Sequence, residues 1–293
     1  ELDLPRHGLE ILPLDGTFTP MPDGDYLWRV DDPQRTRREI ARHSPRDAEA
    51  YAEYGLAMME MARFVKPLLA LEPFDPLSPG WRGLRHLVDI LRRFRALPAE
   101  ARDDHLRLLT MSAVDFLDRW FETDVLKATM AASGIIGTFL GIRSPGTAYV
   151  LLHHYMGEID GAFRAWGLPR GGTGAVSAAI ASAARAAGAE IRPNAPVARI
   201  AVRDGRATGV VLENGDEIGA GTVASSLDPR RTFLELVGEA HLPAEFVDDV
   251  RRYKLPGSSG KVNLALDALP DFACLPGPGA HLRGAISISP SVD

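Results

Sequence analysis

A chain of 293 residues, 45% of them hydrophobic, can bury a sizeable core, and its length favours one large or two medium domains. The net charge of -6 argues against a nucleic-acid partner, which usually leaves a basic footprint on the domain that binds it. No run of about 18 apolar residues occurs, so no membrane-spanning helix is predicted. The single cysteine, Cys274, excludes an internal disulfide and a cysteine metal cluster. It fits a reducing compartment, so we expect a cytoplasmic protein.

The first 30 residues alternate apolar and polar side chains around Asp15-Gly16 and Asp23-Gly24, two dipeptides that favour tight hairpins. They predict a small antiparallel element. From residue 31 to about residue 163 the pattern is helical, and the helix after Ser44 has a clear start. Ser44 is a favourable N-cap and Pro45 suits the first helical position.

The predicted helix over residues 83–97 has an apolar stripe and many arginines outside it. The stripe consists of Leu84, Leu87, Val88, Leu91, Phe94 and Leu97. This spacing is typical of an amphipathic helix. Two interpretations follow: a core-facing stripe with solvated arginines, which we favour, or a helix that makes a peripheral contact with an anionic membrane.

Three glycines, Gly171, Gly172 and Gly174, stand directly before an alanine-rich helix. A phosphate-binding glycine loop needs a strand before it and a helix after it, with G-x-G-x-x-G spacing. The preceding residues do not alternate like a strand, and the spacing does not fit. The glycines therefore do not predict a phosphate loop.

After this helix the period changes to that of strands. A short strand is predicted at residues 189–192, then three strands joined by tight turns at Asp204-Gly205 and Asn214-Gly215, and a final apolar strand at residues 222–225. A helix followed by such a β-meander is half of a cofactor domain.

One cluster of residues resembles half of a metal site. His153, His154, Glu158 and Asp160 place a histidine and a carboxylate four residues apart. No third ligand is identifiable, so we predict no metal and favour a polar cavity wall or a capped helix end. No G-x-S-x-G motif of a hydrolase occurs.

The order of Gly171-Gly172-Thr173-Gly174, a helix, "GAEIRPNAPVARI", "GRATGVVLENGDEI" and "AGTVASSLDP" resembles the FAD-dependent oxidoreductases of the phytoene desaturase and flavin amine oxidase group. Three further segments, "ARHSPRDAEAY", "GTFLGIRSPGTAYVLLHHYMGE" and "KVNLALDALPDF", resemble one phytoene-desaturase-like branch of it. The resemblance implies an FAD-dependent oxidoreductase that transfers hydride between flavin and a hydrophobic organic substrate.

The expected fold class is α/β and α+β: a partial, Rossmann-like FAD-binding domain with a β-meander, plus a substrate domain of helices and antiparallel sheet. We expect residues 1–165 to form the substrate domain and residues 166–240 the partial FAD-binding domain. Residues 241–293 should return to the sheet of the substrate domain through a strand in "KVNLALDAL".

The resemblance also implies site residues. The loop from Leu168 to Ala175 turns beneath the flavin, with Gly171 and Gly172 contacting the cofactor and Leu168, Thr173, Gly174 and Ala175 lining the substrate cavity. Val197 lies beside the adenine and Ser226 at the end of a strand that passes the cofactor. The alternative for the loop is a glycine turn that only feeds a packed helix. No catalytic side chain is predicted.

The family's first G-x-G-x-x-G motif and its last glycine-rich motif are not found in this sequence. We therefore expect an internal piece of a longer protein, which alone neither retains FAD nor is active. A non-catalytic module that presents its helical face to a partner protein or lipid remains an alternative function. A nicotinamide-dependent dehydrogenase would need its own dinucleotide motif. The oligomeric state stays open.

Overall fold

The computed structural model describes residues 2–75, 77, 80–159, 162–163, 166–257 and 259–293. It divides into two compact units. The helical unit comprises residues 9–175 and 258–293, and the meander unit comprises residues 1–8 and 176–257. The chain therefore passes between units at residues 8–9, 175–176 and 257–258. From the sequence we expected domain boundaries after residues 165 and 240.

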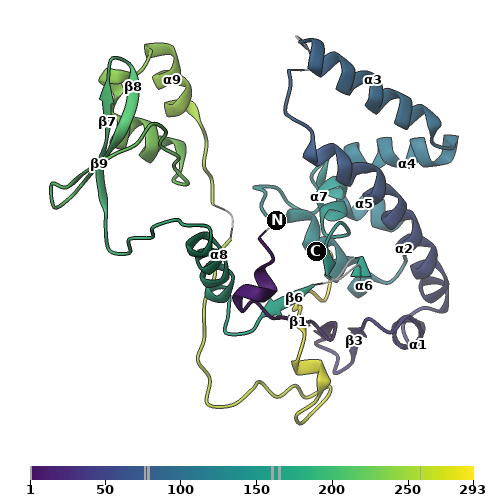
Figure 1. Ribbon diagram of the computed structural model, residues 1–293. Helices are drawn as coiled ribbons and strands as arrows, with labels where there is room; N and C mark the ends of the chain where they lie inside the picture. Colours follow the sequence, from purple (N-terminus) through teal and green to yellow (C-terminus); the bar gives the residue numbers. More distant parts are fainter. Residues whose placement is uncertain (1, 76, 78–79, 160–161, 164–165, 258) are drawn as a thin grey trace. The chain divides into compact units, whose positions relative to one another are not determined.

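The long helix α2 (Pro45–Val65) organises the helical unit (Figure 1). The Ser44 side chain accepts a hydrogen bond from the Asp47 amide at 3.1 Å, which confirms the predicted helix start. The buried Asp47 carboxylate accepts hydrogen bonds from the amides of Glu122 (2.9 Å) and Thr123 (2.8 Å). These bonds tie the first turn of α2 to the residues that precede α6 (Asp124–Ala131).

Tyr54 of α2 is fully buried at the centre of an aromatic cluster. The rings around it belong to Phe116, Trp120, Phe121 and Tyr155, at centroid distances of 5.1 to 6.5 Å. The further helices of this unit are α1 (Pro33–Ala41), η2 (Lys66–Ala70), α3 (Trp81–Ala96), α4 (Ala99–Thr110), α5 (Ala113–Asp118), η3 (Ala132–Ile135), α7 (Thr147–His153) and η6 (Ala280–Leu282).

A three-stranded sheet with the order β10-β2-β3 joins the two ends of the helical unit. Strands β2 (Thr17–Pro20) and β3 (Tyr26–Arg29) form an antiparallel hairpin, with Gly24 of the predicted turn at a φ of +88°. Strand β10 (Ala285–Ile286) pairs in parallel with β2. Strand β10 thus brings the last residues back to the first sheet, whereas residues 241–257 of the predicted return belong to the meander unit.

The prediction of a strand in "KVNLALDAL" was wrong, because residues 261–269 pair with no strand in the described residues. Strand β10 takes the place beside β2. The side chains of Val262 and Leu264 are 78% and 72% exposed, so the apolar alternation of this segment is not buried against a neighbour. Alternation indicates two faces of an extended segment, but it does not supply a pairing partner.

The hairpin predicted at Asp15-Gly16 was also wrong. Strand β1 (Ile11–Pro13) pairs with β6 (Gly167–Pro169) and not with β2. Gly16 has a different role: a Cβ added there would lie 2.1 Å from the Arg29 carbonyl oxygen. The glycine therefore permits close approach of the chain to the end of β3. The short strands β4 (Glu158–Ile159) and β5 (Ala162–Phe163) complete the unit.

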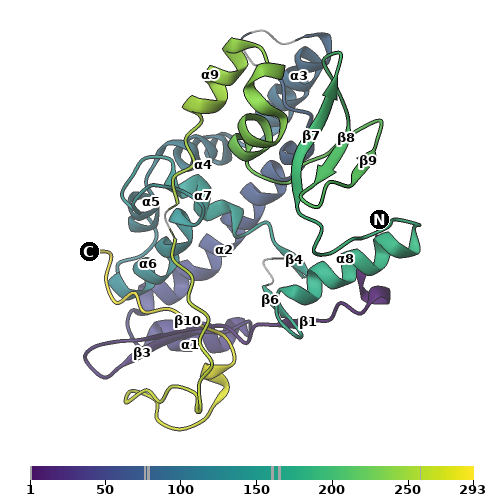
Figure 2. The same ribbon diagram turned by 90° about the vertical axis from the view of Figure 1, so that its left-hand side faces the viewer.

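The meander unit contains the antiparallel sheet of β7 (Val197–Arg203), β8 (Arg206–Leu212) and β9 (Glu217–Gly219) (Figure 2). Asp204 and Gly205 have φ values of +48° and +73°, and Gly215 has +92°, so both predicted turns are confirmed. The other elements of this unit are η1 (Leu4–His7), most of α8 (Gly174–Ala186), the π-helix η4 (Arg230–Gly238), η5 (Glu239–His241) and α9 (Ala244–Arg252).

The strands predicted at residues 189–192 and 222–225 are absent, because neither segment has a pairing partner in the described part of the chain. The mixture of helices and small sheets nevertheless confirms the predicted fold class. None of the helices in the described residues combines the length and apolarity needed to cross a membrane.

The apolar stripe of helix α3 is more exposed than the core-facing stripe that we favoured. Leu84, Val88 and Leu91 are each about 40% exposed, and the one buried residue of α3 in the described range is Gly83. Leu87 and Phe94 are half-buried, and the Phe94 ring packs on Phe64 at 6.2 Å, so the stripe is only partly core.

Candidate functional site

The glycine turn predicted to border the cofactor leads from β6 into α8. The amide of Gly172 donates to the Pro169 carbonyl at 2.9 Å, and the Ala175 amide donates to the Gly172 carbonyl at 3.0 Å. Gly171 and Gly172 have φ values of +83° and +84°. Two consecutive residues in the left-handed region account for the glycines, since other residues seldom adopt that conformation.

The outer face of this turn is open backbone. A Cβ added at Gly172 would meet nothing within 4 Å, and one at Gly171 would meet the Ala175 Cβ at 4.0 Å. The amides of Gly171 and Thr173 have no hydrogen-bond acceptor within the described residues. Free donors beside glycines that lack side chains allow a planar ligand to approach the chain closely.

The start of the turn is held by contacts between Arg170 and Glu10, next to the paired strands β6 and β1. The Arg170 guanidinium makes two hydrogen bonds to the Glu10 carboxylate, at 2.5 and 3.0 Å, and the Arg170 amide donates to the Glu10 carbonyl at 2.9 Å. The ion pair is exposed and adds little stability, but its two-point geometry fixes the register of β6 against β1. The glycine turn therefore begins at a defined place.

Apolar side chains flank the turn. Leu168 is 58% exposed and Trp166 is 49% exposed. The Trp166 carbonyl accepts the Leu14 amide at 3.0 Å, and its ring stacks on His154 with centroids 5.3 Å apart and planes 19° apart. Sequence reasoning missed Trp166. The available signal was a tryptophan two residues before a loop that was already predicted to line a cavity.

His153 and His154 do not converge on a common point. The His153 ring packs edge-on against Tyr149 at 4.8 Å, whereas His154 stacks on Trp166. Burial, and to a smaller extent the nearby His153, lower the pKa of His154 below its ordinary value of 6.5. A hydrogen bond with the Ser133 backbone acts in the other direction and raises this pKa, but it does not outweigh the other two effects. His154 is therefore neutral at pH 7.

No group of three metal-ligating side chains occurs in the part of the chain that the structure describes. The Glu158 side chain and all of Asp160, which the sequence analysis grouped with these histidines, lie outside the described residues. His154 thus takes part in an aromatic stack beside the glycine turn.

The six predicted loop residues, Leu168 and Gly171 to Ala175, lie together in the helical unit, whereas Val197 and Ser226 belong to the meander unit. Val197 opens β7 and pairs with Leu212, which borders an open cavity of about 680 Å³. Ser226 is exposed on an irregular segment, so its predicted position at the end of a strand was wrong. The roles of these residues in cofactor binding stay predictions.

Comparison with known proteins identifies the family. Residues 13–271 match the model of the flavin containing amine oxidoreductase family. The chain is 35% identical to pyridine nucleotide-disulfide oxidoreductase domain-containing protein 2 of Rattus norvegicus, over 99% of this chain and 53% of that protein. It is 36% identical to the Mus musculus protein of the same name, over 97% and 52%.

A more distant relative is the phytoene desaturase (neurosporene-forming) of Rhodobacter capsulatus, 25% identical over 78% of this chain and 40% of that protein. The resemblance to phytoene-desaturase-like flavoproteins that the motif order predicted is thereby confirmed. The chain spans about half the length of the two rodent relatives. The family match extends through both compact units, and the chain belongs to the flavin containing amine oxidoreductase family.

Proposed function

We propose that the full-length protein is an FAD-dependent oxidoreductase that transfers hydride between flavin and a hydrophobic organic substrate in the cytoplasm. The observation that carries the proposal is the open face of the glycine turn, in a chain whose family is flavin-dependent. The exposed amides before α8 lack intrahelical acceptors, as at any helix N-terminus, so they are available to a ligand, and the empty space beside Gly172 leaves room for one.

The residues present fit a flavin. Gly171 and Gly172 would hold it by backbone contact, since neither carries a side chain and the space beside Gly172 is empty. Val197 of the meander unit would lie beside the adenine, as the family resemblance implies. When bound, the flavin supplies the hydride acceptor or donor, so the chain itself needs no acid or base for that transfer.

The protein's own contribution is to orient the substrate and exclude water. Leu168, Thr173, Gly174 and Ala175 would line the cavity, with Leu168 and Trp166 as its apolar wall. The neutral His154 ring stacks on Trp166 and fixes its plane without placing a charge in the wall. An apolar wall favours an apolar substrate, and one relative is named for phytoene, which it desaturates.

The experiment uses the full-length protein with FAD bound. Leu168→Asp should slow anaerobic reduction of the flavin by phytoene at least tenfold, because a carboxylate in an apolar wall must be desolvated. Leu56→Asp is the matched control, since Leu56 of α2 is also 58% exposed but lies far from the turn in sequence. Equal reduction rates for the two variants would contradict the proposed wall.

A second candidate function, contact with an anionic lipid surface, rests on α3. Trp81 is 76% exposed, and Leu84, Val88 and Leu91 are exposed on the same helix. Arginines flank these residues at positions 82, 85, 92, 93 and 95. An apolar stripe bordered by arginines suits the interface of an anionic membrane.

Cosedimentation with phosphatidylserine vesicles tests this second function. The wild-type chain should sediment with the vesicles, and Leu84→Ser combined with Leu91→Ser should remain in the supernatant. The control variant is Leu106→Ser combined with Leu109→Ser on α4, since both of its leucines are more than half exposed. If the wild-type chain stayed in the supernatant, that result would contradict the proposed lipid contact.

A further inference from the structure

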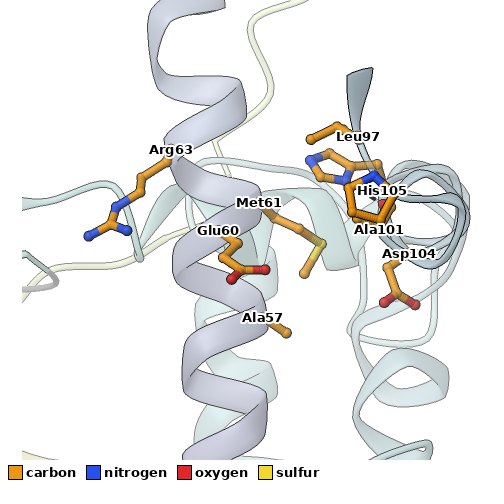
Figure 3. A pocket seen from close by; sticks show the side chains of 9 residues that line it. Ala57, Glu60, Met61, Arg63, Leu97, Ala101, Asp104 and His105 are labelled. Atoms are coloured by element: carbon orange, nitrogen blue, oxygen red, sulfur yellow. Dashed lines mark hydrogen bonds between the residues drawn. The ribbon is translucent and has the colours of Figure 1, made fainter. Parts of the chain in front are cut away.

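A cavity of about 360 Å³ lies between α2 and α4 in the helical unit (Figure 3). Its inner wall is apolar and its rim is charged. The lining residues are Ala57, Glu60, Met61, Arg63, Leu97, Pro98, Ala101, Asp104 and His105. The volume is at the lower end of the roughly 300–1,000 Å³ range of small-molecule sites.

His105 is the buried polar side chain of this wall, with an exposed fraction of 5%. Its Nδ1 lies 2.6 Å from the Ala101 carbonyl oxygen. Because a carbonyl oxygen only accepts, Nδ1 must carry the hydrogen. In the neutral ring Nε2 is then a bare acceptor, and the structure gives this buried atom no hydrogen-bond partner.

In the described residues no donor hydrogen-bonds to Nε2, although the Arg63 guanidinium lines the same cavity. Phe64 of α2 and Phe94 of α3 lie against the ring at centroid distances of 4.8 and 6.3 Å, both close to perpendicular. A buried acceptor that finds no donor loses the hydrogen bonds it had in water, which is unfavourable. A ligand hydroxyl could supply this missing donor.

The charges at the rim balance. Glu60 and Arg63 are one helical turn apart on α2, and Asp104 of α4 lies 3.9 Å from Arg119. The lining itself carries two acidic residues and one basic residue, and Arg119, outside the lining, balances the second carboxylate. The rim therefore favours a neutral ligand over an ammonium or a carboxylate.

We propose that this cavity binds a small neutral molecule with an apolar body and one hydroxyl, whose O–H donates to Nε2 of His105. Met61 forms part of the wall and is 3% exposed. Its flexible thioether can shift to let the hydroxyl reach the ring nitrogen. This site shares no residue with the glycine turn, so it goes beyond the proposed flavin chemistry.

The test titrates the 293-residue chain with benzyl alcohol, with its isostere ethylbenzene and with benzylamine. Imidazole ¹⁵N resonances are followed, and His105→Phe assigns the His105 signal. Benzyl alcohol should shift the Nε2 resonance saturably and bind about tenfold tighter than ethylbenzene, because it alone satisfies the acceptor and stays neutral. In His105→Phe the two ligands should bind equally.

Filling the cavity provides a check that does not alter His105. Ala57→Phe should abolish the benzyl alcohol shift, whereas Ala52→Phe, on the exposed side of the same helix, should leave it unchanged. Equal affinity for benzyl alcohol and ethylbenzene, tighter binding of benzylamine, or no saturable shift of the His105 resonance would each overturn the proposal.

Discussion

Replacing Gly172 by valine separates a cofactor contact from a purely structural turn. The φ of +84° places valine in the left-handed region, which costs about 1–3 kcal/mol of folding free energy for a residue other than glycine. Steric overlap adds nothing to this cost, since the added Cβ meets no atom within 4 Å. The isopropyl group would occupy the open face where we propose that the flavin lies.

Gly215 in the β8–β9 turn is a matched control. Its φ is +92°, and an added Cβ there also meets nothing within 4 Å. Gly215→Val should therefore cost about the same 1–3 kcal/mol without touching the glycine turn. Urea unfolding of the full-length variants measures the free-energy cost, and the visible absorption band of the purified proteins measures flavin occupancy.

We expect both variants to lose similar stability and Gly172→Val alone to lose flavin or substrate-driven flavin reduction. Full flavin occupancy and normal reduction in Gly172→Val, together with the loss of stability, would refute the cofactor contact. The two glycines would then serve only to turn the chain into α8.

Three further predictions address the fold and the cofactor. Asp47→Ala should lower the free energy of unfolding by about 2 kcal/mol in urea titrations, because it leaves two part-buried amides without their acceptor, and an unchanged value would contradict this. Since burial holds the pKa of His154 below 6.5, the unfolded chain binds that proton more readily, so stability should fall as the pH drops below 6.5. His154→Phe should flatten this part of a thermal-melting pH series, and an identical profile would refute the assignment. The 293-residue chain purified alone should be colourless, because no G-x-G-x-x-G loop contributes to pyrophosphate binding; a flavin absorption band would show otherwise.

Local signals in the sequence predicted local structure well. The Ser44 cap and the Asp204-Gly205 turn depend on contacts within a few residues, and the structure confirms both. The amphipathic pattern of residues 83–97 likewise predicted α3 within two residues at each end. In these places neighbouring side chains and backbone dihedral angles determine the conformation.

Pairing between distant segments was harder to predict. The alternation in residues 261–269 resembles that of a strand, but the place beside β2 is taken by β10. The stripe of α3 was expected to be core, but Leu84, Val88 and Leu91 are exposed, because periodicity shows which residues share a face and not what covers it. The stack of Trp166 on His154 is set by tertiary geometry, so the sequence alone did not reveal this part of the candidate site.

The central claim is that the glycine turn borders the flavin in the full-length protein. Hydrogen–deuterium exchange of that protein with and without FAD tests it at the amides of Gly171 and Thr173, which have no acceptor in the described residues. We predict that FAD slows exchange in the peptide covering residues 166–175 and leaves the β2–β3 turn at Gly24 unchanged. Equal exchange of residues 166–175 in the apo and FAD-loaded proteins, with FAD binding verified by its absorption band, would contradict the claim.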